Sequence, residues 1–261
     1  MFHDVNWHDL LHSMEHIVWW RLGPVAALDI LSYLIVAFEW QLLLKPEGDL
    51  RFADATRAVF AGRLANDVLP VQLGYLVRIF LASRAMGKGF TAVVPSLLIE
   101  RLLDGFWLGI GILLLTFFTP LPPVLLRARD ILGAVIGAGI LLTLILMLRS
   151  GAGGDGREWL RGTGPKALRS FRKFLRGVIN RMRDIARSRV LPSVIVLAMV
   201  KLVVQGLAYF AVLWAYRLDV SIWTGLAVFL IAYLGITVPS TPASAGVFQF
   251  FSVLGLELFG I

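Results

Sequence analysis

Long apolar runs, separated by short clusters of proline, glycine and charged residues, make up most of the chain. A run of about 20 apolar residues is long enough to cross a hydrocarbon core about 30 Å thick as a helix. The runs lack the alternation of apolar and polar positions that a transmembrane β-barrel requires. The pattern therefore predicts an all-α fold, a polytopic membrane helix bundle that forms a single domain over 1–261. The expected spans are 23–44, 90–119, 131–148, 190–216 and 222–238.

The apolar run 55–86 is interrupted by the cluster 66–70 and by Gly74. The proline of that cluster lacks an N–H group and clashes with the preceding helical turn, so we expect two helical pieces. A backbone broken at membrane depth is tolerated only where it lines a cavity or is buried in protein, which favours a re-entrant segment. The alternative is a simple proline kink with Arg63 and Asp67 as an ordinary surface pair.

A second cluster of helix-breaking residues occupies 239–246, after the span 222–238. It is rich in proline, serine, alanine and glycine, so we expect another interruption there. The apolar segment 247–261 that follows has only fifteen residues, too few for a relaxed crossing of the membrane.

Charged side chains gather between Arg63 and Asp104 within otherwise apolar sequence. A charge at the bilayer centre costs about 2.5 to 3.5 kcal/mol even on the lenient insertion scale, so such residues pair, face water or bind a ligand. Glu100 and Asp104 are four residues apart and share a helical face. They either act as acid and base or form ion pairs, for which the candidate cations are Arg63, Arg78 and Arg101.

Three further charges lie inside other spans. Glu39 is close enough to the end of its span to reach the interface, whereas Asp29 is deeper and is expected to face protein. Lys201 and Gln205 are four residues apart on one face, and the ammonium group needs an acidic partner. The candidate partners are Asp29, Glu100 and Asp104.

Composition supports the membrane class, with 58% hydrophobic and 16% charged residues and a mean hydropathy of +0.79. Soluble domains carry about 25% charged residues. There is no cysteine, which excludes disulfides, thiolate metal sites and a cysteine nucleophile. The first twenty residues lack the basic start, apolar core and cleavage site of a secretory signal peptide.

The four histidines, His3, His8, His12 and His16, all lie near the start of the chain. The last three recur every four residues, a spacing that stacks them on one helical face and could bind zinc. An amphipathic helix at the membrane interface, beside the tryptophans Trp7, Trp19 and Trp20, is the simpler interpretation. We therefore predict no metal and no cofactor.

The segment 149–189 carries twelve Lys or Arg against three acids. Basic loops shorter than about 60 residues stay cytoplasmic, so the neighbouring ends of 131–148 and 190–216 should face the cytosol. The same reasoning places 84–88 inside, together with 45–57 if the run 55–86 is re-entrant. We expect a multi-pass protein of the cell membrane, in the inner membrane if the source is bacterial.

Within that basic segment, apolar residues alternate by three and four between Leu168 and Ile185, with basic residues on the other faces. This pattern is typical of an amphipathic helix that lies on anionic headgroups, where each Lys or Arg contributes about 1 kcal/mol. A merely solvated linker is the alternative. Nucleic acid is a poorer fit because no folded reading domain accompanies the segment.

In the two clusters of helix-breaking residues, and at the charged residues that follow the first of them, the chain resembles the flippase-like membrane domain family. This family includes the transmembrane part of lysylphosphatidylglycerol synthases. The resemblance rests on 66–78 (NDVLPVQLGYLVR) followed by 100–104 (ERLLD), and more weakly on 239–249. It implies a bundle of about eight helices with broken or re-entrant segments that moves or accommodates lipids. Members usually carry Glu where Tyr75 and Gln249 stand here, which implies another lipid preference. The resemblance further implies that the family's first helix and its last one or two are missing here, so we expect a divergent short member or a fragment.

Three functions compete. The first is a lipid flippase or lipid-binding transporter without covalent chemistry, in which one polar cavity binds a membrane lipid. The second is an integral membrane enzyme acting on lipid or isoprenoid substrates, with Glu100 and Asp104 as acid and base or metal ligands. The third is a scaffold that docks a lipid-modifying synthase through 149–189. For the first hypothesis the predicted lining residues are Arg63, Asn66, Asp67, Pro70, Gly74, Arg78, Glu100, Arg101, Asp104, Lys201, Gln205, Pro239, Gly246 and Gln249.

Overall fold

All elements that the structure describes are helices, which confirms the predicted all-α fold. The computed structural model describes residues 18–69, 73–119, 188–237 and 246–261, with separate residues inside 123–134 and 177–187. Helices Trp19–Leu44 and Leu191–Ala215 are the two in this part of the chain that are long and apolar enough to cross a membrane. In chain order the elements are η1 (Trp19–Arg21), α2 (Leu22–Leu44), α3 (Phe52–Val68), α4 (Gly74–Met86), α5 (Phe90–Leu115), α8 (Leu191–Ala215), α9 (Ile222–Thr237) and α10 (Val247–Leu258).

The clusters of turn-forming residues end the helices where the sequence predicts. Helix α2 is followed by a turn over 45–47, and Gly48 then adopts a φ of +152° that few other residues tolerate. Helix α4 ends at Gly87, which is left-handed with φ +61°. The Lys88 N–H group then donates to the Ser83 carbonyl oxygen at 2.9 Å, so a carbonyl of the last turn is satisfied.

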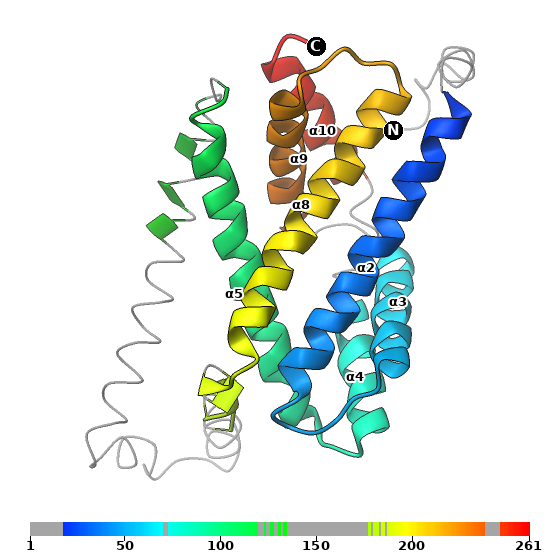
Figure 1. Ribbon diagram of the computed structural model, residues 1–261, viewed down its shortest axis with the longest axis vertical. Coiled ribbons are helices and arrows are strands. Elements are labelled where there is room, and N and C mark those ends of the chain that lie inside the picture. The colour runs from blue at the N-terminus through cyan, green and yellow to red at the C-terminus, as the bar shows by residue number, and fades with distance from the viewer. Residues whose placement is uncertain are drawn as a thin grey trace.

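Helices α2 and α8 run side by side in opposite directions in the middle of the bundle (Figure 1). The start of α2 is tied to the end of α8 by two hydrogen bonds. The Val18 N–H donates to the Ala215 carbonyl oxygen at 3.1 Å, and the Arg21 guanidinium donates to the Trp214 carbonyl oxygen at 2.8 Å. Helices α3, α5 and α9 pack on this antiparallel pair, and α4 and α10 in turn pack on α3 and α9.

Helices α3 and α4 pack against each other as a hairpin, which confirms the predicted interruption of the run 55–86. With 17 and 13 residues they are about 25 and 20 Å long, too short to cross a membrane singly. Their backbones approach closely, because a Cβ atom at Gly62 would lie 2.9 Å from the Gly74 carbonyl oxygen. The Gly74 N–H donates to the Asn66 side-chain oxygen at 2.7 Å, so the polar residue of the break satisfies the start of α4.

Helices α9 and α10 form a second hairpin of short helices. Glycines again permit the contact, since a Cβ atom at Gly255 would lie 2.9 Å from a methyl group of Val228. Figure 1 shows that this hairpin starts from the end of the bundle at which α8 finishes, whereas the α3/α4 hairpin starts from the opposite end. Both hairpins carry Pro-x-x-x-Gly before their second helix, at 70–74 and at 242–246. The α3/α4 and α9/α10 hairpins therefore have opposite orientations in the bundle.

Two apolar clusters form the core, and charged residues lie between them. One cluster contains residues of α2, α3, α4 and α5, among them Trp40, Leu43 and Val93. The other joins α5, α8 and α9 and includes Ile112 and Phe229. Helix α5 passes from one cluster to the other, so its middle turns, with their acidic residues, are held at the boundary between them.

The end of α2 and the starts of α5 and α8 lie at one end of the bundle (Figure 1). The Arg181 guanidinium donates to the Glu47 carboxylate at 2.8 Å, which joins the end of the basic segment to the α2–α3 link. The ends of α2 and α4 and the start of α8 thus lie at the same end of the bundle, as the prediction that 45–57, 84–88 and the start of α8 share one side of the membrane requires. That this side is cytoplasmic stays a prediction.

One prediction about α2 is wrong: Asp29 is exposed instead of facing protein. The reason is that the buried residues of α2 begin at Ser32, so Asp29 lies in the half of the helix that the other described helices cover least. The predictions for the histidines, for 131–148, for most of 149–189 and for 239–245 fall largely outside the described residues.

Candidate functional site

A cavity of about 330 Å³ lies where α2, α3, α4, α5, α8 and α9 meet. Of the residues predicted to line it, Pro70 and Pro239 lie outside the described part of the chain. Gly246 and Gln249 are not in its wall, because Gln249 is used at the start of α10, where its side-chain oxygen accepts from the Gly246 N–H at 2.8 Å. The others all contribute to the wall: Arg63, Asn66, Asp67, Gly74, Arg78, Glu100, Arg101, Asp104, Lys201 and Gln205.

Arg78 of α4 and Glu100 of α5 form the most buried pair of the wall. The guanidinium donates two hydrogen bonds to the two carboxylate oxygens, at 3.0 and 2.8 Å, and the side chains are 5% and 2% exposed. Two parallel bonds between these planar groups give both strength and a fixed orientation. Such a pair persists in a dry interior only when this geometry offsets the loss of hydration. Arg78 is thus one of the three predicted partners of Glu100.

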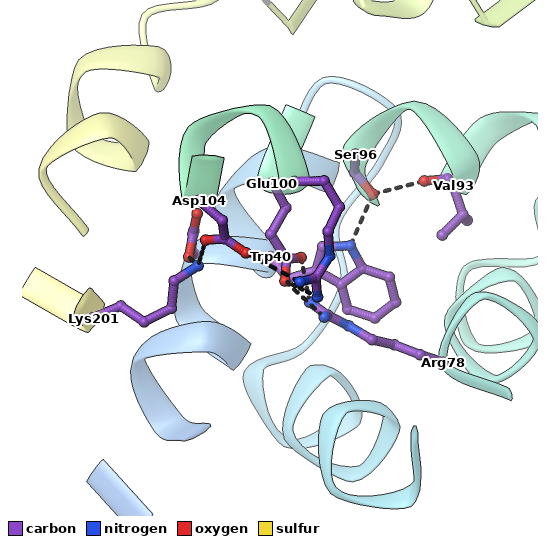
Figure 2. A network of polar contacts seen from close by, with 9 residues as sticks. Trp40, Arg78, Val93, Ser96, Glu100, Asp104 and Lys201 are labelled. Atoms are coloured by element: carbon purple, nitrogen blue, oxygen red, sulfur yellow. Dashed lines mark hydrogen bonds and ion pairs between the residues drawn. The ribbon is translucent and has the colours of Figure 1, made fainter. Parts of the chain in front are cut away.

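Lys201 reaches from α8 to two carboxylates. Its ammonium group lies 2.6 Å from the Asp104 carboxylate and donates to the Glu39 carboxylate at 2.8 Å. Figure 2 shows Lys201 and Arg78 approaching the acidic residues of α5 from opposite sides. Asp104 was a predicted partner, but the expectation that Glu39 reaches the interface is wrong. Glu39 is fully buried because α8 crosses α2 at its height and supplies the ammonium group.

Together these side chains make a charged network that is electrically balanced. Its charges join α2 and α8, which are distant in the sequence, to the consecutive helices α4 and α5. An unbalanced charge at this depth would be costly, so equal numbers of cations and anions make the burial tolerable. The three carboxylates are Glu39, Glu100 and Asp104, and the three cations are Arg78, Arg101 and Lys201.

Two arginines at the edge of the cavity are much more exposed than the rest of its charges. The Arg101 side chain is 46% exposed, and its guanidinium lies 3.7 Å from the Glu100 carboxylate and 3.3 Å from that of Asp104. Arg63 is 53% exposed and pairs with Asp67 at 3.5 Å. The cavity therefore runs from a closed floor of ion pairs to a mouth with accessible guanidinium groups.

Each arginine of the cavity lies against an aromatic ring. The guanidinium carbons of Arg63, Arg78 and Arg101 lie 5.7, 4.0 and 4.5 Å from the ring centroids of Tyr33, Trp40 and Tyr75, respectively. Such cation–π contacts contribute about 0.5 to 2 kcal/mol each, depending on desolvation.

Trp40 is positioned by a short chain of hydrogen bonds. Its indole N–H donates to the Ser96 hydroxyl at 2.8 Å, and that hydroxyl donates to the Val93 carbonyl oxygen at 2.7 Å (Figure 2). The sequence analysis missed Trp40, because a tryptophan inside an apolar span carries no signal that separates it from ordinary core. The Glu39-Trp40 pair, a charge beside a large ring in mid-span, was the one available hint.

The wall also offers neutral polar groups. The side-chain oxygen of Gln205 has no hydrogen-bond partner among the described residues and lies in the wall. Tyr233 of α9 and Gly105 of α5 complete the side facing the second hairpin. An added Cβ at Gly105 would meet nothing within 4 Å, so this position faces open space.

For chemistry, the arrangement offers binding groups more readily than free acids or bases. Glu100 and Asp104, the candidate acid and base, are each engaged by cations. In the part of the chain that the structure describes, no three His, Asp or Glu side chains gather as a metal site would require. A polar group of a ligand would meet guanidinium groups at the mouth and the Gln205 amide deeper in.

Comparison with known proteins identifies a family for the chain. The model of a family described as "Lysylphosphatidylglycerol synthase TM region" matches residues 1–261, which is the whole chain. No curated protein and no solved structure shows significant similarity to it.

Proposed function

The chain belongs to the lysylphosphatidylglycerol synthase TM-region family, and from this premise we propose that it is a lipid flippase or lipid-binding transporter. Membership makes it a membrane protein connected with lipid metabolism. The proposal goes further: the protein moves a lipid across or within the membrane without covalent chemistry. We place it as a multi-pass protein in the cell membrane, with the segment 149–189 against anionic headgroups and a lipid-biosynthesis enzyme as its partner.

The observation that carries the proposal is the charged cavity between two oppositely oriented hairpins. A space of about 330 Å³ inside an apolar bundle, walled by guanidinium and carboxylate groups, suits a polar headgroup far better than an acyl chain. Transporters commonly place their binding site where broken helices of two inverted halves meet near the middle of the membrane. The breaks at 69–73 and 238–246 fit that arrangement.

Gly105 offers a direct test, because its position faces the open space of the cavity. Gly105→Leu should fill part of the cavity and stop lipid movement without disturbing the ion pairs. Gly23→Leu is the matched control, since Gly23 also has nothing within 4 Å and is not in the cavity wall. Both variants replace a helical glycine by a good helix former, so stability should not fall in either.

The assay follows a fluorescent phospholipid in reconstituted vesicles, with the label in the outer leaflet destroyed chemically. Wild type and Gly23→Leu should move the lipid faster than empty vesicles, and Gly105→Leu should approach the empty-vesicle rate. Wild-type movement no faster than in empty vesicles would contradict transport. Full activity of Gly105→Leu would show that the lipid takes another route, and a scaffold would be indifferent to the filled cavity.

A further inference from the structure

The charges of the cavity differ in how available they are to a ligand. Glu100 and Asp104 are at most 9% exposed and are held by Arg78 and Lys201 at hydrogen-bonding distances. A cationic ligand would have to displace one of these cations from the dry floor of the cavity, which leaves a buried charge without a partner. The floor therefore disfavours a cationic group.

Arg101 is in the opposite situation. It is half-exposed, and its contacts with the two carboxylates, at 3.7 and 3.3 Å, are longer than those of the buried cations. Both carboxylates keep another cation if Arg101 turns toward a ligand. Its release therefore leaves neither carboxylate without an ion-pair partner, whereas release of Arg78 would leave Glu100 with little compensation.

The ring of Tyr75 orients this guanidinium. The guanidinium carbon lies 4.5 Å from the ring centroid, so one face of the planar group is covered by the tyrosine. A guanidinium fixed in this way presents its N–H edge as a fork, which matches two oxygens of a phosphate. Arg63 at the same mouth is half-exposed and faces Tyr33 in a looser version of the same arrangement.

We propose that Arg101 binds the phosphate of a lipid headgroup at the mouth of the cavity, with Tyr75 as its positioning residue. The proposal rests on the proposed function and narrows its substrate class to phospholipids, as opposed to phosphate-free or cationic amphiphiles. The Arg63–Asp67 pair beside it can neutralise a second headgroup charge of either sign. The phosphate is the recognised group, whether the headgroup is anionic or zwitterionic.

The test measures lipid binding by thermal stabilisation of the full chain in dodecyl maltoside, a detergent without phosphate. Three dioleoyl lipids are titrated: phosphatidylglycerol, phosphatidylcholine and diacylglycerol. Wild type should bind the phospholipids more tightly than diacylglycerol. Arg101→Gln should weaken phospholipid binding roughly ten- to a hundredfold, as expected for lost hydrogen bonds to a charged group, and should leave diacylglycerol unchanged.

Arg57→Gln is the matched control, because Arg57 is an exposed arginine paired with Asp54 outside the cavity wall. Tyr75 supplies an independent test: Tyr75→Phe keeps the ring and should bind normally. Tyr75→Glu places a competing carboxylate under the guanidinium and should weaken binding as Arg101→Gln does. Melting of each variant without lipid shows whether it is folded.

Equal stabilisation by diacylglycerol, or a phospholipid preference that survives Arg101→Gln, overturns the proposal. Stabilisation by phosphatidylglycerol but not by phosphatidylcholine also overturns it, because both headgroups carry the phosphate. The outcomes are separable from those of the transport assay. If the protein binds phospholipids through the phosphate but does not move them, the proposed transport is wrong, and the assignment of the phosphate to Arg101 stands. If the protein moves lipids with and without a phosphate equally well, transport stands, and the assignment of the phosphate to Arg101 is wrong.

Discussion

Replacing Arg78 with glutamine should destabilise the bundle strongly. The substitution leaves the Glu100 carboxylate, 2% exposed, with Arg101 at 3.7 Å as its nearest remaining ion-pair partner. Removing one member of a buried pair costs about 3 to 5 kcal/mol, because the other charge stays buried without compensation. Melting temperatures of chains of 150 to 250 residues change by about 2 to 4 °C per kcal/mol, so the expected loss is roughly 6 to 20 °C.

Arg78→Lys separates charge from geometry. Lysine keeps the positive charge but makes a single hydrogen bond where the guanidinium makes two, and it loses the planar stacking on Trp40. One hydrogen bond to a charged group contributes about 1.5 to 3 kcal/mol, so its melting temperature should lie between those of wild type and Arg78→Gln. Lipid movement should fall sharply because the cavity floor loses its fixed orientation, even where the protein is still expressed.

The measurement is a thermal melt in detergent, arranged as a double-mutant cycle with Glu100→Gln. Because the double variant carries no buried charge at this pair, it should be more stable than the sum of the two single losses predicts. Arg57→Gln, at an exposed pair on α3, should change stability by less than about 1 kcal/mol. The reasoning would be refuted if the stability losses of the two single variants simply added in the double variant. It would also be refuted if Arg78→Gln and Arg78→Lys melted and transported lipid as the wild type does.

Two other outcomes are expected. Gly62→Ala should lower the melting temperature and loosen the α3/α4 hairpin, because its Cβ would press on the Gly74 carbonyl oxygen. Gly23→Ala is the control and should not destabilise the protein, since Gly23 has nothing within 4 Å. Equal melting temperatures of the two variants would contradict the close contact between α3 and α4. A peptide covering 168–185 should bind anionic vesicles and lose binding as salt shortens the Debye length from about 10 Å toward 3 Å; binding that ignores salt would refute the electrostatic part.

The residues between Arg63 and Asp104 could be placed from the sequence because local rules govern them. A proline and a glycine in an apolar run break a helix wherever the run folds, and charges in such a run must find partners. The spacing of Glu100 and Asp104 put them on one face of α5, and the structure brings Arg78 and Arg101 to that face. Whether these residues bind a substrate stays a prediction.

Other features depend on how distant helices cross, and no local rule contains that information. Glu39 looked close enough to a helix end to reach water, but α8 brings Lys201 to it from 162 residues away. Asp29 looked deep, but the helices that pack on α2 do so beyond it. Trp40 has only apolar neighbours three and four residues away on its own helix face, so its role beside Arg78 appears only when α2 and α4 are packed together.

The Glu39–Lys201 pair also has a consequence for the synthesis and membrane insertion of the protein. Ribosomes add roughly 5 to 20 residues per second, so Glu39 is synthesised about 8 to 32 s before Lys201. During that interval α2 carries an acidic residue in mid-span without the ammonium group that it contacts in the finished bundle. We therefore expect α2 to remain beside the insertion machinery, out of contact with lipid, until α8 is made. Nascent chains stopped before α8 should accordingly stay accessible to quality-control proteases.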